Sequence, residues 1–388
     1  MQGLESLHIE GRRALVRVDF NVPLHDDGTI RDDTRIRAAL PTLEYLLQRD
    51  CACVVATHLG RPGGQRIEDL RIDPIASRLA DLLPDRAVQH CDDITGETAQ
   101  SMAYALRPGT LGLLQNLRFH PGEEADDPDL AAGLAQLGDV YVNDAFAVCH
   151  RRHASVYSVA RHFPAADRAA GLLVRRETQA IDGAMDQPAR PFVAVIGGAK
   201  VSDKIAAMRA LLDRVDHVLV GGVPAFTLLK ARGDDVGGAP VEEDQLDAAR
   251  QLLDKAGDRL LLPVDHAVPA PRDDVLTVDM LPAGVAALDI GAETSTRYRQ
   301  ILEQAGTVIW NGPMGYVEDP RFFAGSRTVA RAIARSGANA IVGGGDTTGI
   351  PQRLGLLDAM THVSTGGGAF LSYVAHRTLP ALQALGDE

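Results

Sequence analysis

The stretch PFVAVIGGAKVSDK (residues 191–204) begins with an apolar segment, passes through two glycines and continues into a segment of helical character. A helix that begins at glycines presents free backbone N–H groups and the positive end of its dipole, a combination that binds phosphate. Lys200 and Lys204 are four residues apart, so we expect both on one face of this helix, each contacting a different phosphate of one ligand. Taken alone, the stretch fits a βα turn with two solvated lysines equally well.

Apolar segments recur along the whole chain and alternate with helical patterns. Strands are predicted at 14–18, 52–57, 110–114, 140–142, 192–196, 217–220, 259–262, 307–310 and 340–342. Helical patterns lie between most of them, for example at 35–49, 74–83 and 206–215. Strands that alternate with helices predict an α/β protein with parallel sheets covered on both faces. The nearly continuous apolar strands agree with burial on both sides.

The length of 388 residues exceeds what one hydrophobic core usually serves, so we predict two domains. A boundary is indicated at 170–191, where a helical pattern ends in two prolines. The predicted organisation is an N-terminal domain at 1–171, a connecting helix at 172–190 and a C-terminal domain at 191–370. Residues 371–388 are expected to pack back onto the first domain.

The formal net charge of -13 argues against nucleic-acid and membrane-surface binding, because both require a positive field. No apolar run approaches the length of a membrane span, and the N-terminal residues lack the apolar core of a signal peptide. We therefore expect a cytoplasmic protein. The four cysteines show no metal-binding spacing and are expected to be reduced apolar residues.

Polar residues follow each predicted strand of the first half, at the sheet edge where ligands of open α/β sheets bind. They are Asp19, Asn21, His58, Arg61, Asn116, Arg118, Asn143 and Asp144. Arg35 at a helix start and the basic run HRRH at 150–153 add to them. Converging arginines and histidines in a protein of negative charge predict a small, multiply anionic ligand, because guanidinium groups match phosphate and carboxylate. The acidic segment 123–129 is expected to be a solvated loop.

Glycine-rich loops dominate the second half. Besides the first stretch they are GG at 221–222, WNGPMG at 310–315, GGGDTTG at 343–349 and STGGGA at 364–369. Any one of them could be a simple turn, but five in one domain favour phosphate binding through backbone amides. Asp346 is the best candidate for a magnesium ligand. P-loop, dinucleotide-binding and protein-kinase signatures are absent, so we predict phosphoryl transfer between two ligands that meet when the domains close.

Ten motifs in order resemble the phosphoglycerate kinase family over nearly the whole chain. They are RVDFNVP (17–23), DDTRI (32–36), HLGRP (58–62), NLRFHPGE (116–123), YVNDAF (141–146), HRRHAS (150–155), GGAKVSDKI (197–205), WNGPMG, GGGD and STGGGA. The resemblance implies two Rossmann-like three-layer domains with parallel sheets, joined by a connecting helix, with the active-site cleft between them. It also implies reversible phosphoryl transfer from 1,3-bisphosphoglycerate to ADP, with 3-phosphoglycerate held by the N-terminal domain and Mg-nucleotide by the C-terminal domain.

The resemblance also implies a role for each matched position. Those on the phosphoglycerate would be Asp19, Asn21, Arg35, His58, Arg61, Arg118 and Arg151. Those on the nucleotide would be Lys204, Asn311, Glu318, Gly343, Gly344, Gly345, Asp346 and Thr347, with Asp346 on Mg²⁺. Arg35 and Lys200 would act on the transferring phosphoryl group. The resemblance further suggests a monomer.

Several positions depart from the family pattern. Gln115 replaces a glutamate and would remove a negative charge beside Arg118, AVCHRRH (147–153) replaces GTAHRAH, Pro224 replaces a methionine, and Phe-Leu-Ser at 370–372 replaces Ser-Leu-Glu. The complete set of phosphate-contacting residues favours an active kinase. The departures support an alternative, a divergent paralogue that binds the same ligands for regulation. An unrelated dehydrogenase is a third reading, which the missing GxGxxG motif opposes.

Overall fold

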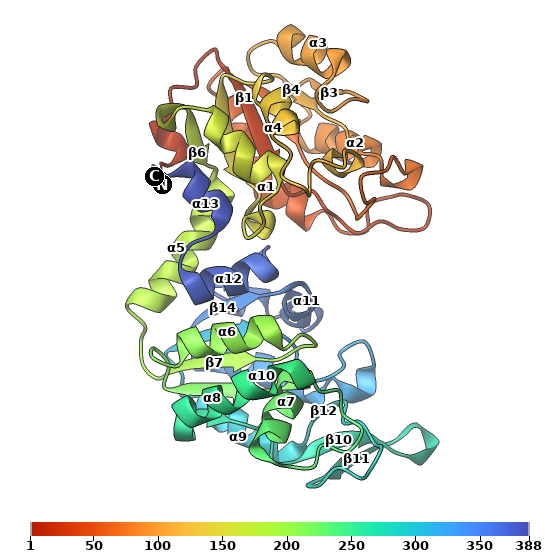
Figure 1. Ribbon diagram of the computed structural model, residues 1–388, viewed down its shortest axis with the longest axis vertical. Helices are drawn as coiled ribbons and strands as arrows, with labels where there is room; N and C mark the ends of the chain where they lie inside the picture. Colours follow the sequence, from red (N-terminus) through yellow and green to blue (C-terminus); the bar gives the residue numbers. More distant parts are fainter. Residues whose placement is uncertain (1, 387–388) are drawn as a thin grey trace. The chain divides into compact units, whose positions relative to one another are not determined.

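The computed structural model describes residues 2–386 (Figure 1). The chain forms two compact units, one containing the segment up to Thr178 and the segment from Thr378 onward, the other containing residues 179–377. Each unit is built on a six-stranded parallel sheet, which confirms the predicted α/β class with two Rossmann-like domains. Within the described range, no helix is both long and apolar enough to span a bilayer.

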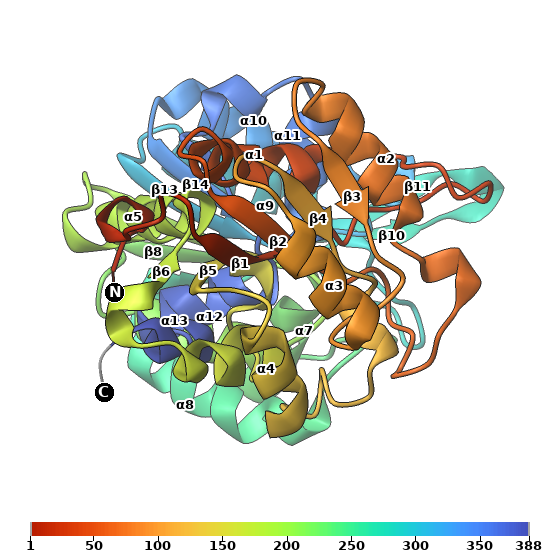
Figure 2. The same ribbon diagram turned by 90° about the horizontal axis from the view of Figure 1, so that it is seen from above.

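The sheet of the first unit has the order β3-β4-β2-β1-β5-β6, and Figure 2 shows β3, β4, β2 and β1 side by side. Its strands are β1 (Arg13–Val18), β2 (Ala52–Ala56), β3 (Val88–His90), β4 (Leu111–Leu113), β5 (Val140–Asp144) and β6 (Arg168–Ala170). Its helices are α1 (Thr34–Leu47), α2 (Asp73–Leu82), α3 (Glu97–Ala105), α4 (Pro128–Ala135) and α13 (Pro380–Leu385). The strands β3 (VQH) and β6 (RAA) were not predicted, because neither lies in a continuous apolar run, whereas the equally short β4 (LGL) does.

The main sheet of the second unit has the order β15-β14-β13-β7-β8-β9, and a small antiparallel sheet has the order β11-β10-β12. The main strands are β7 (Phe192–Ile196), β8 (His217–Val220), β9 (Leu260–Leu261), β13 (Thr307–Asn311), β14 (Asn339–Gly343) and β15 (His362–Val363). The small sheet contains β10 (His266–Pro269), β11 (Val275–Val278) and β12 (Asp289–Ile290). It was not predicted, because β10 ends in a proline, which strands usually avoid, and β11 is partly exposed.

Helices follow most strands of the second unit. They are α6 (Ser202–Leu211), α7 (Gly222–Arg232), α8 (Leu246–Ala256), α9 (Ala292–Leu302), α10 (Ala324–Ser336), α11 (Gly345–Arg353) and α12 (Gly368–His376). The remaining helix, α5 (Leu172–Asp186), contains the point at which the chain divides between the units. Helix α13 packs against β6 and the segment 154–162, so the end of the described chain belongs to the first unit.

The stretch PFVAVIGGAKVSDK (residues 191–204) lies at the centre of the second unit. Strand β7 is buried along its whole length and pairs with β13 on one side and β8 on the other. Helix α6 begins at Ser202, four residues beyond Gly198, which has a φ of 90° that glycine adopts readily. Lys200 therefore precedes the helix and is exposed, whereas Lys204 lies in its first turn and is buried. The expectation that both lysines lie on one face of the helix is wrong.

The first turn of α5 is capped by a buried carboxyl group. Asp144, the last residue of β5, accepts hydrogen bonds at Oδ1 from Leu173 N at 2.9 Å and Val174 N at 3.3 Å. Gly171 is required here, because a Cβ at that position would collide with the Asp144 carboxyl group. Burial raises the pKa of Asp144 to about 7, outweighing the two backbone amides, which favour the charged form.

This pKa predicts a pH-dependent effect of Asp144→Asn on stability. Between about pH 4 and pH 7 the folded protein binds the Asp144 proton and the unfolded chain does not, so rising pH destabilises the folded state. An asparagine keeps the oxygen acceptor for the α5 cap and does not ionise. We expect the stability advantage of the variant over the parent to be larger near pH 8 than near pH 5, by on the order of 3 kcal/mol.

Thermal and urea unfolding at both pH values measure this difference. Asp85→Asn is the matched control, because Asp85 is exposed and forms no ion pair within the described residues. A stability change for Asp144→Asn of equal size at both pH values would contradict the assignment.

Candidate functional site

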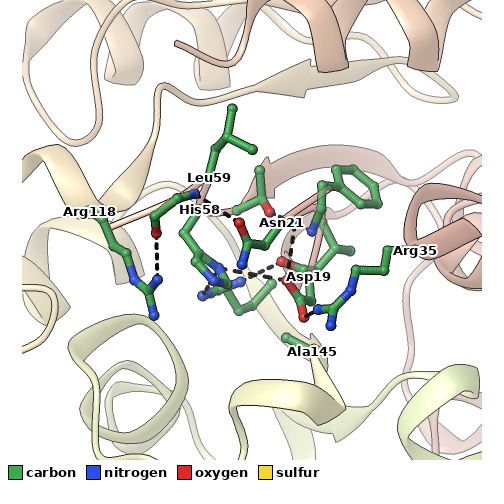
Figure 3. Close-up of polar contacts among 12 residues, drawn as sticks. Asp19, Asn21, Arg35, His58, Leu59, Arg118 and Ala145 are labelled. Atoms are coloured by element: carbon green, nitrogen blue, oxygen red, sulfur yellow. Dashed lines mark hydrogen bonds and ion pairs between the residues drawn. The ribbon is translucent and has the colours of Figure 1, made fainter. Parts of the chain in front are cut away.

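Polar side chains from three loops meet at the carboxyl edge of the first sheet (Figure 3). Asp19 follows β1, and one of its carboxylate oxygens forms an ion pair with Arg35 in the first turn of α1. The other oxygen accepts a hydrogen bond from Asn21 N at 3.1 Å and lies 3.9 Å from His58 Nδ1. Asn21 Oδ1 in turn accepts a hydrogen bond from Gly60 N at 2.8 Å. Four of the predicted phosphoglycerate-binding residues are therefore neighbours.

A buried arginine, Arg17, lies beside this cluster. It is the first residue of the motif RVDFNVP, but the sequence did not predict a role for it. It is 1% exposed, its Nε donates to Ser155 Oγ at 2.8 Å, and its Nη2 lies 3.1 Å from His58 Nδ1. Burial, together with the charges of Arg17 and Arg118, holds the pKa of His58 well below its usual range, so His58 is neutral at pH 7. A charged residue inside the apolar run ALVRVDF was the sequence signal for Arg17, because arginine is almost never buried unless it is paired.

Glu123 holds this buried arginine in place. Its Oε1 accepts from Ser155 Oγ at 2.6 Å and lies 3.8 Å from Arg17 Nη2, and its Oε2 accepts from Ser155 N at 3.0 Å. Glu123 is 0% exposed, so the expectation of a solvated acidic loop at 123–129 is wrong for its first residue. Sequence reasoning missed it because its partners are more than 30 residues away in the chain.

The loop after β4 places Arg118 next to the loop after β2. Asn116 Nδ2 donates to Leu59 O at 2.8 Å, and Asn116 Oδ1 accepts from Leu59 N and from Arg118 N, both at 3.1 Å. The Arg118 side chain donates through Nη1 to Gly60 O at 2.7 Å, and its Nε lies 3.1 Å from Glu124 Oε1. The contact with Gly60 leads back to Asn21, so Arg118 and Asn21 hold the same short loop.

The last two predicted phosphoglycerate-binding residues, Arg61 and Arg151, are exposed. Neither side chain forms a hydrogen bond or an ion pair within residues 2–386. The charge of Arg151 nevertheless reaches the site, because it contributes to lowering the pKa of His153, which burial brings to about 3. Both arginines are therefore available to an anionic ligand.

The Gln115 side chain forms its hydrogen bonds with residues other than Arg118. Its Nε2 donates to Asp92 Oδ1 at 2.9 Å, and its Oε1 accepts from Ile72 N at 3.0 Å and from Asn116 N at 2.9 Å. The side chain is 1% exposed and makes no contact with Arg118 in the described part of the chain. Gln115 thus supports Asn116 and joins the segments that contain Ile72 and Asp92.

In the second unit, the glycine loops after β7, β8 and β13 pack against one another. A Cβ on Gly197 would lie 2.9 Å from the carbonyl carbon of Pro313, and one on Gly222 would lie 2.7 Å from Gly198 N. Backbone hydrogen bonds join the same loops, from Gly198 N to Pro313 O at 2.8 Å and from Gly222 N to Met314 O at 3.0 Å. These glycines are required for the close approach of one backbone to another. At Gly197 and Gly222, the packing of the loops is sufficient to explain why the residue is glycine.

The loop after β14 is more open. A Cβ on Gly345 would meet no atom within 4 Å, and Gly344 has a φ of 107°. Gly345, Asp346 and Thr347 form the first turn of α11, in which Thr347 N donates to Gly344 O at 3.0 Å while the first two backbone N–H groups have no partner within the helix. Thr347 is buried and its Oγ1 accepts from Gly312 N at 2.7 Å, whereas Asp346 is exposed. Open glycine amides and a carboxylate at one helix start are suitable for a phosphate and its metal ion.

Lys204 is the buried cation of this unit. It is 8% exposed, and its ammonium group donates to Asn311 Oδ1 at the end of β13. Asn311 Nδ2 donates to Gly343 O at 2.7 Å, which links Lys204 to the loop after β14. Burial lowers the pKa of Lys204 to about 8, while the charges of Asp203 and Asp346 favour the protonated form. A bound phosphate would supply a negatively charged partner for the Lys204 ammonium group.

Two predicted residues, Lys200 and Glu318, are exposed and form no side-chain contact with the others within the described chain. No group of three or more His, Cys, Asp or Glu side chains suited to a metal occurs between residues 2 and 386. The four cysteines are free and buried.

A family model described as phosphoglycerate kinase matches residues 4–377. The chain belongs to the phosphoglycerate kinase family. The phosphoglycerate kinase of Moorella thermoacetica is 48% identical over 394 residues, covering 99% of both chains. Solved phosphoglycerate kinases from Coxiella burnetii (TM-score 0.84, 37% identity) and Pyrococcus horikoshii OT3 (TM-score 0.87, 34% identity) each cover 99% of this chain and 98% of their own. Since these matches extend through both units, neither unit is an addition to the phosphoglycerate kinase fold.

The Arg17–Glu123 pair predicts a large loss of stability in Glu123→Gln. Removing one charge from a buried ion pair leaves the other uncompensated, and we expect a loss of about 3 kcal/mol in the free energy of unfolding. Denaturant unfolding measures it, with Glu124→Gln as the control. Glu124 is about half exposed, and its loss should change stability by less than ~1 kcal/mol. Equal effects of the two variants would show that Arg17 does not depend on Glu123.

The contact between Gln115 and Asp92 predicts the effect of restoring the family's glutamate. In Gln115→Glu a second carboxylate faces Asp92, whose pKa the bond from Arg66 lowers to about 2. We expect a loss of ~1–2 kcal/mol in unfolding free energy at neutral pH, because a part-buried hydrogen bond becomes a repulsion. The double variant Gln115→Glu/Asp92→Asn should recover most of it, since the asparagine amide can donate. A loss that persists in the double variant would place the cause elsewhere.

Proposed function

We propose that the protein catalyses reversible phosphoryl transfer from 1,3-bisphosphoglycerate to ADP, giving 3-phosphoglycerate and ATP. The observation that carries the proposal is the pair of half-sites at the carboxyl edges of the two parallel sheets. One contains a cluster of arginines, and the other contains a buried lysine beside open glycine amides. Both lie within the range that the family model matches.

The half-site of the first unit is suited to 3-phosphoglycerate. Arg61 and Arg151 are exposed and have no hydrogen-bond or ion-pair partner among the described residues, and Arg35 is 31% exposed while paired with Asp19. Guanidinium groups bind phosphate and carboxylate through paired hydrogen bonds. Neutral His58 can donate or accept a hydrogen bond without adding charge. We assign the phosphoglycerate to this unit and place Arg35 nearest the transferring group.

The half-site of the second unit is suited to a nucleotide that arrives with Mg²⁺. Asp346 is a single exposed carboxylate beside open amides, and magnesium is usually held by one or two carboxylates together with substrate phosphates. Asp346 would hold the ion, which neutralises charge on the phosphate oxygens. Lys204 would bind a nucleotide phosphate, with Asn311, Thr347 and the glycines at 343–345 around it, and Glu318 would accept the ribose hydroxyls.

The reaction requires little of the protein beyond binding the two substrates and placing positive charge near the transferring phosphoryl group. The attacking group in the ATP-consuming direction is a carboxylate, which at a pKa of about 4 is ionised at neutral pH, so no general base is needed. Catalysis then requires alignment of donor and acceptor and positive charge around the transferring oxygens, which Arg35 and the mobile Lys200 would supply. The proposal includes hinge-bending closure during turnover, a monomeric state and a cytoplasmic location.

The departures from the family pattern do not favour a non-catalytic paralogue. Pro224 is the third residue of α7, where its missing N–H has no partner within the helix in any case. Gln115 makes three hydrogen bonds and leaves the arginines untouched. The relatives described above carry the enzyme's name, which favours the active kinase.

A coupled steady-state assay tests the proposal. Purified protein receives 3-phosphoglycerate, Mg²⁺ and ATP, and the bisphosphoglycerate formed is followed through its reduction by a dehydrogenase. We expect Mg-dependent turnover on the order of 1–1,000 per second. Binding of both ligands without turnover would instead establish the binding paralogue.

Lys200→Ala tests whether Lys200 acts on the transferring group while Lys204 binds the nucleotide. If Lys200 acts on the transferring group, its loss should lower kcat by about 10²–10³-fold and leave nucleotide affinity nearly unchanged. Calorimetric titration with Mg-ADP and the coupled assay measure the two quantities. Lys255→Ala serves as control, because Lys255 is an exposed lysine of α8 paired with Asp213. Comparable losses of affinity and turnover in Lys200→Ala would contradict a role in the transition state.

A further inference from the structure

Phe370, one of the departures from the family pattern, lies directly against the nucleotide half-site. It is the third residue of α12 and is 0% exposed. A Cβ built on Gly343 would lie 2.5 Å from Phe370 Cδ1 and 2.7 Å from Cδ2. The ring therefore occupies the space where any side chain at residue 343 would begin.

Gly343 connects this ring to the buried lysine. It is the last residue of β14 and stands in register with Asn311 of β13. Its carbonyl oxygen accepts from Asn311 Nδ2 at 2.7 Å, and Asn311 Oδ1 accepts from Lys204 Nζ. Three consecutive contacts, all within the second unit, thus lead from Phe370 to Lys204.

Lys204 depends on this chain of contacts for its position. The bond to Asn311 is the one hydrogen bond that its ammonium group donates within the described residues. Helix α12 also packs against α6, the helix that carries Lys204 (Figure 1). Phe370 is therefore linked to Lys204 through Gly343 and Asn311, and its helix packs against the helix that carries Lys204.

We propose that Phe370 is a positioning residue for nucleotide binding, which holds Gly343 and, through Asn311, sets the position of the Lys204 ammonium group. The proposal rests on the proposed kinase function, because it takes Lys204 as a nucleotide-phosphate ligand. Phe370 also makes glycine obligatory at residue 343. An added methyl group there collides with the ring, and a smaller residue at 370 removes the collision.

The test uses the full chain and the variants Phe370→Ser, Phe370→Leu, Gly343→Ala and Phe370→Ser/Gly343→Ala. In Phe370→Ser we expect KM for Mg-ATP to rise roughly 10-fold with kcat within about 3-fold of the parent, because a ground-state contact with phosphate is weakened. Phe370→Leu, which keeps apolar bulk, should stay within about 2-fold of the parent in both constants. An unchanged KM in Phe370→Ser would overturn the proposal.

The double variant provides the sharper result. Gly343→Ala should raise KM for Mg-ATP at least as much as Phe370→Ser, and adding Phe370→Ser to it should recover about 5-fold or more, since residues in contact are not additive. If the effects of the two substitutions simply multiply, the ring does not act through Gly343. Should Phe370→Ser fail to fold, the same comparison is made with Gly343→Ala and Gly343→Ala/Phe370→Ala, since alanine also removes the ring.

Val374→Ala separates positioning from general destabilisation. Val374 is 1% exposed on the same helix, and the three atoms nearest to a Cβ on Gly343 all belong to Phe370, so truncation of Val374 should lower Tm without raising KM. A rise of KM in this control matching that of Phe370→Ser would overturn the proposal. If the proposed kinase function is wrong, the parent protein will show no turnover. This outcome differs from a failure of the Phe370 proposal, in which the parent turns over and the KM values do not change as expected. Calorimetric titration of the same variants with Mg-ADP would still decide the role of Phe370.

Discussion

Burying a positive charge is the constraint on which both half-sites depend. A cation removed from water loses several kcal/mol of solvation unless partners replace it. In the first unit Arg17 has such partners, because Glu123 and Ser155 surround it inside the protein. In the second unit, the one hydrogen bond that the Lys204 ammonium group donates within the described residues goes to the amide oxygen of Asn311, and burial lowers its pKa to about 8. One cation is therefore structural, and the other is left for an anion to complete.

This difference explains how the two sheets divide their tasks. Around Arg17 the polar groups are bound to each other, so Asp19, His58 and Arg35 are held before any ligand arrives. Arg61 and Arg151, whose side chains have no hydrogen-bond or ion-pair partner in the described part of the chain, lie outside this network. In the second unit the support is mostly backbone, with interlocked glycine loops and the amides of α11. The backbone amides of such a site can contact phosphate oxygens closely, because no side chain lies between the amides and the ligand.

The glycines divide into three classes that composition alone cannot separate. Gly197 and Gly222 are required by neighbouring backbone, whereas Gly345 faces open space. Gly343 belongs to a third case, in which the side chain of Phe370 fills the space. Its requirement for glycine comes from a partner 27 residues further along the chain.

The positions of the departures show how a site can change without losing its ligands. Gln115 exchanges a charge for an amide and meets Asp92 at a distance from the arginines. Pro224 occupies a helix position where no backbone donor is needed. Phe370 replaces a small polar residue with a ring that is wholly buried. Each change is absorbed by its immediate surroundings, and none removes a charged group from either half-site.

The sequence alone determined the α/β class, most of the parallel strands and the family, because burial on both faces leaves continuous apolar runs and the phosphate-binding motifs are local. It also identified most of the polar residues at the strand ends, since parallel strands bring those ends to one edge. Tertiary structure alone decided the role of Glu123, the surroundings of Gln115, the separation of Lys200 from α6, and the contact of Phe370 with Gly343. The physical reason is that burial and pairing are contacts between segments distant in the chain, and neither composition nor local periodicity records them.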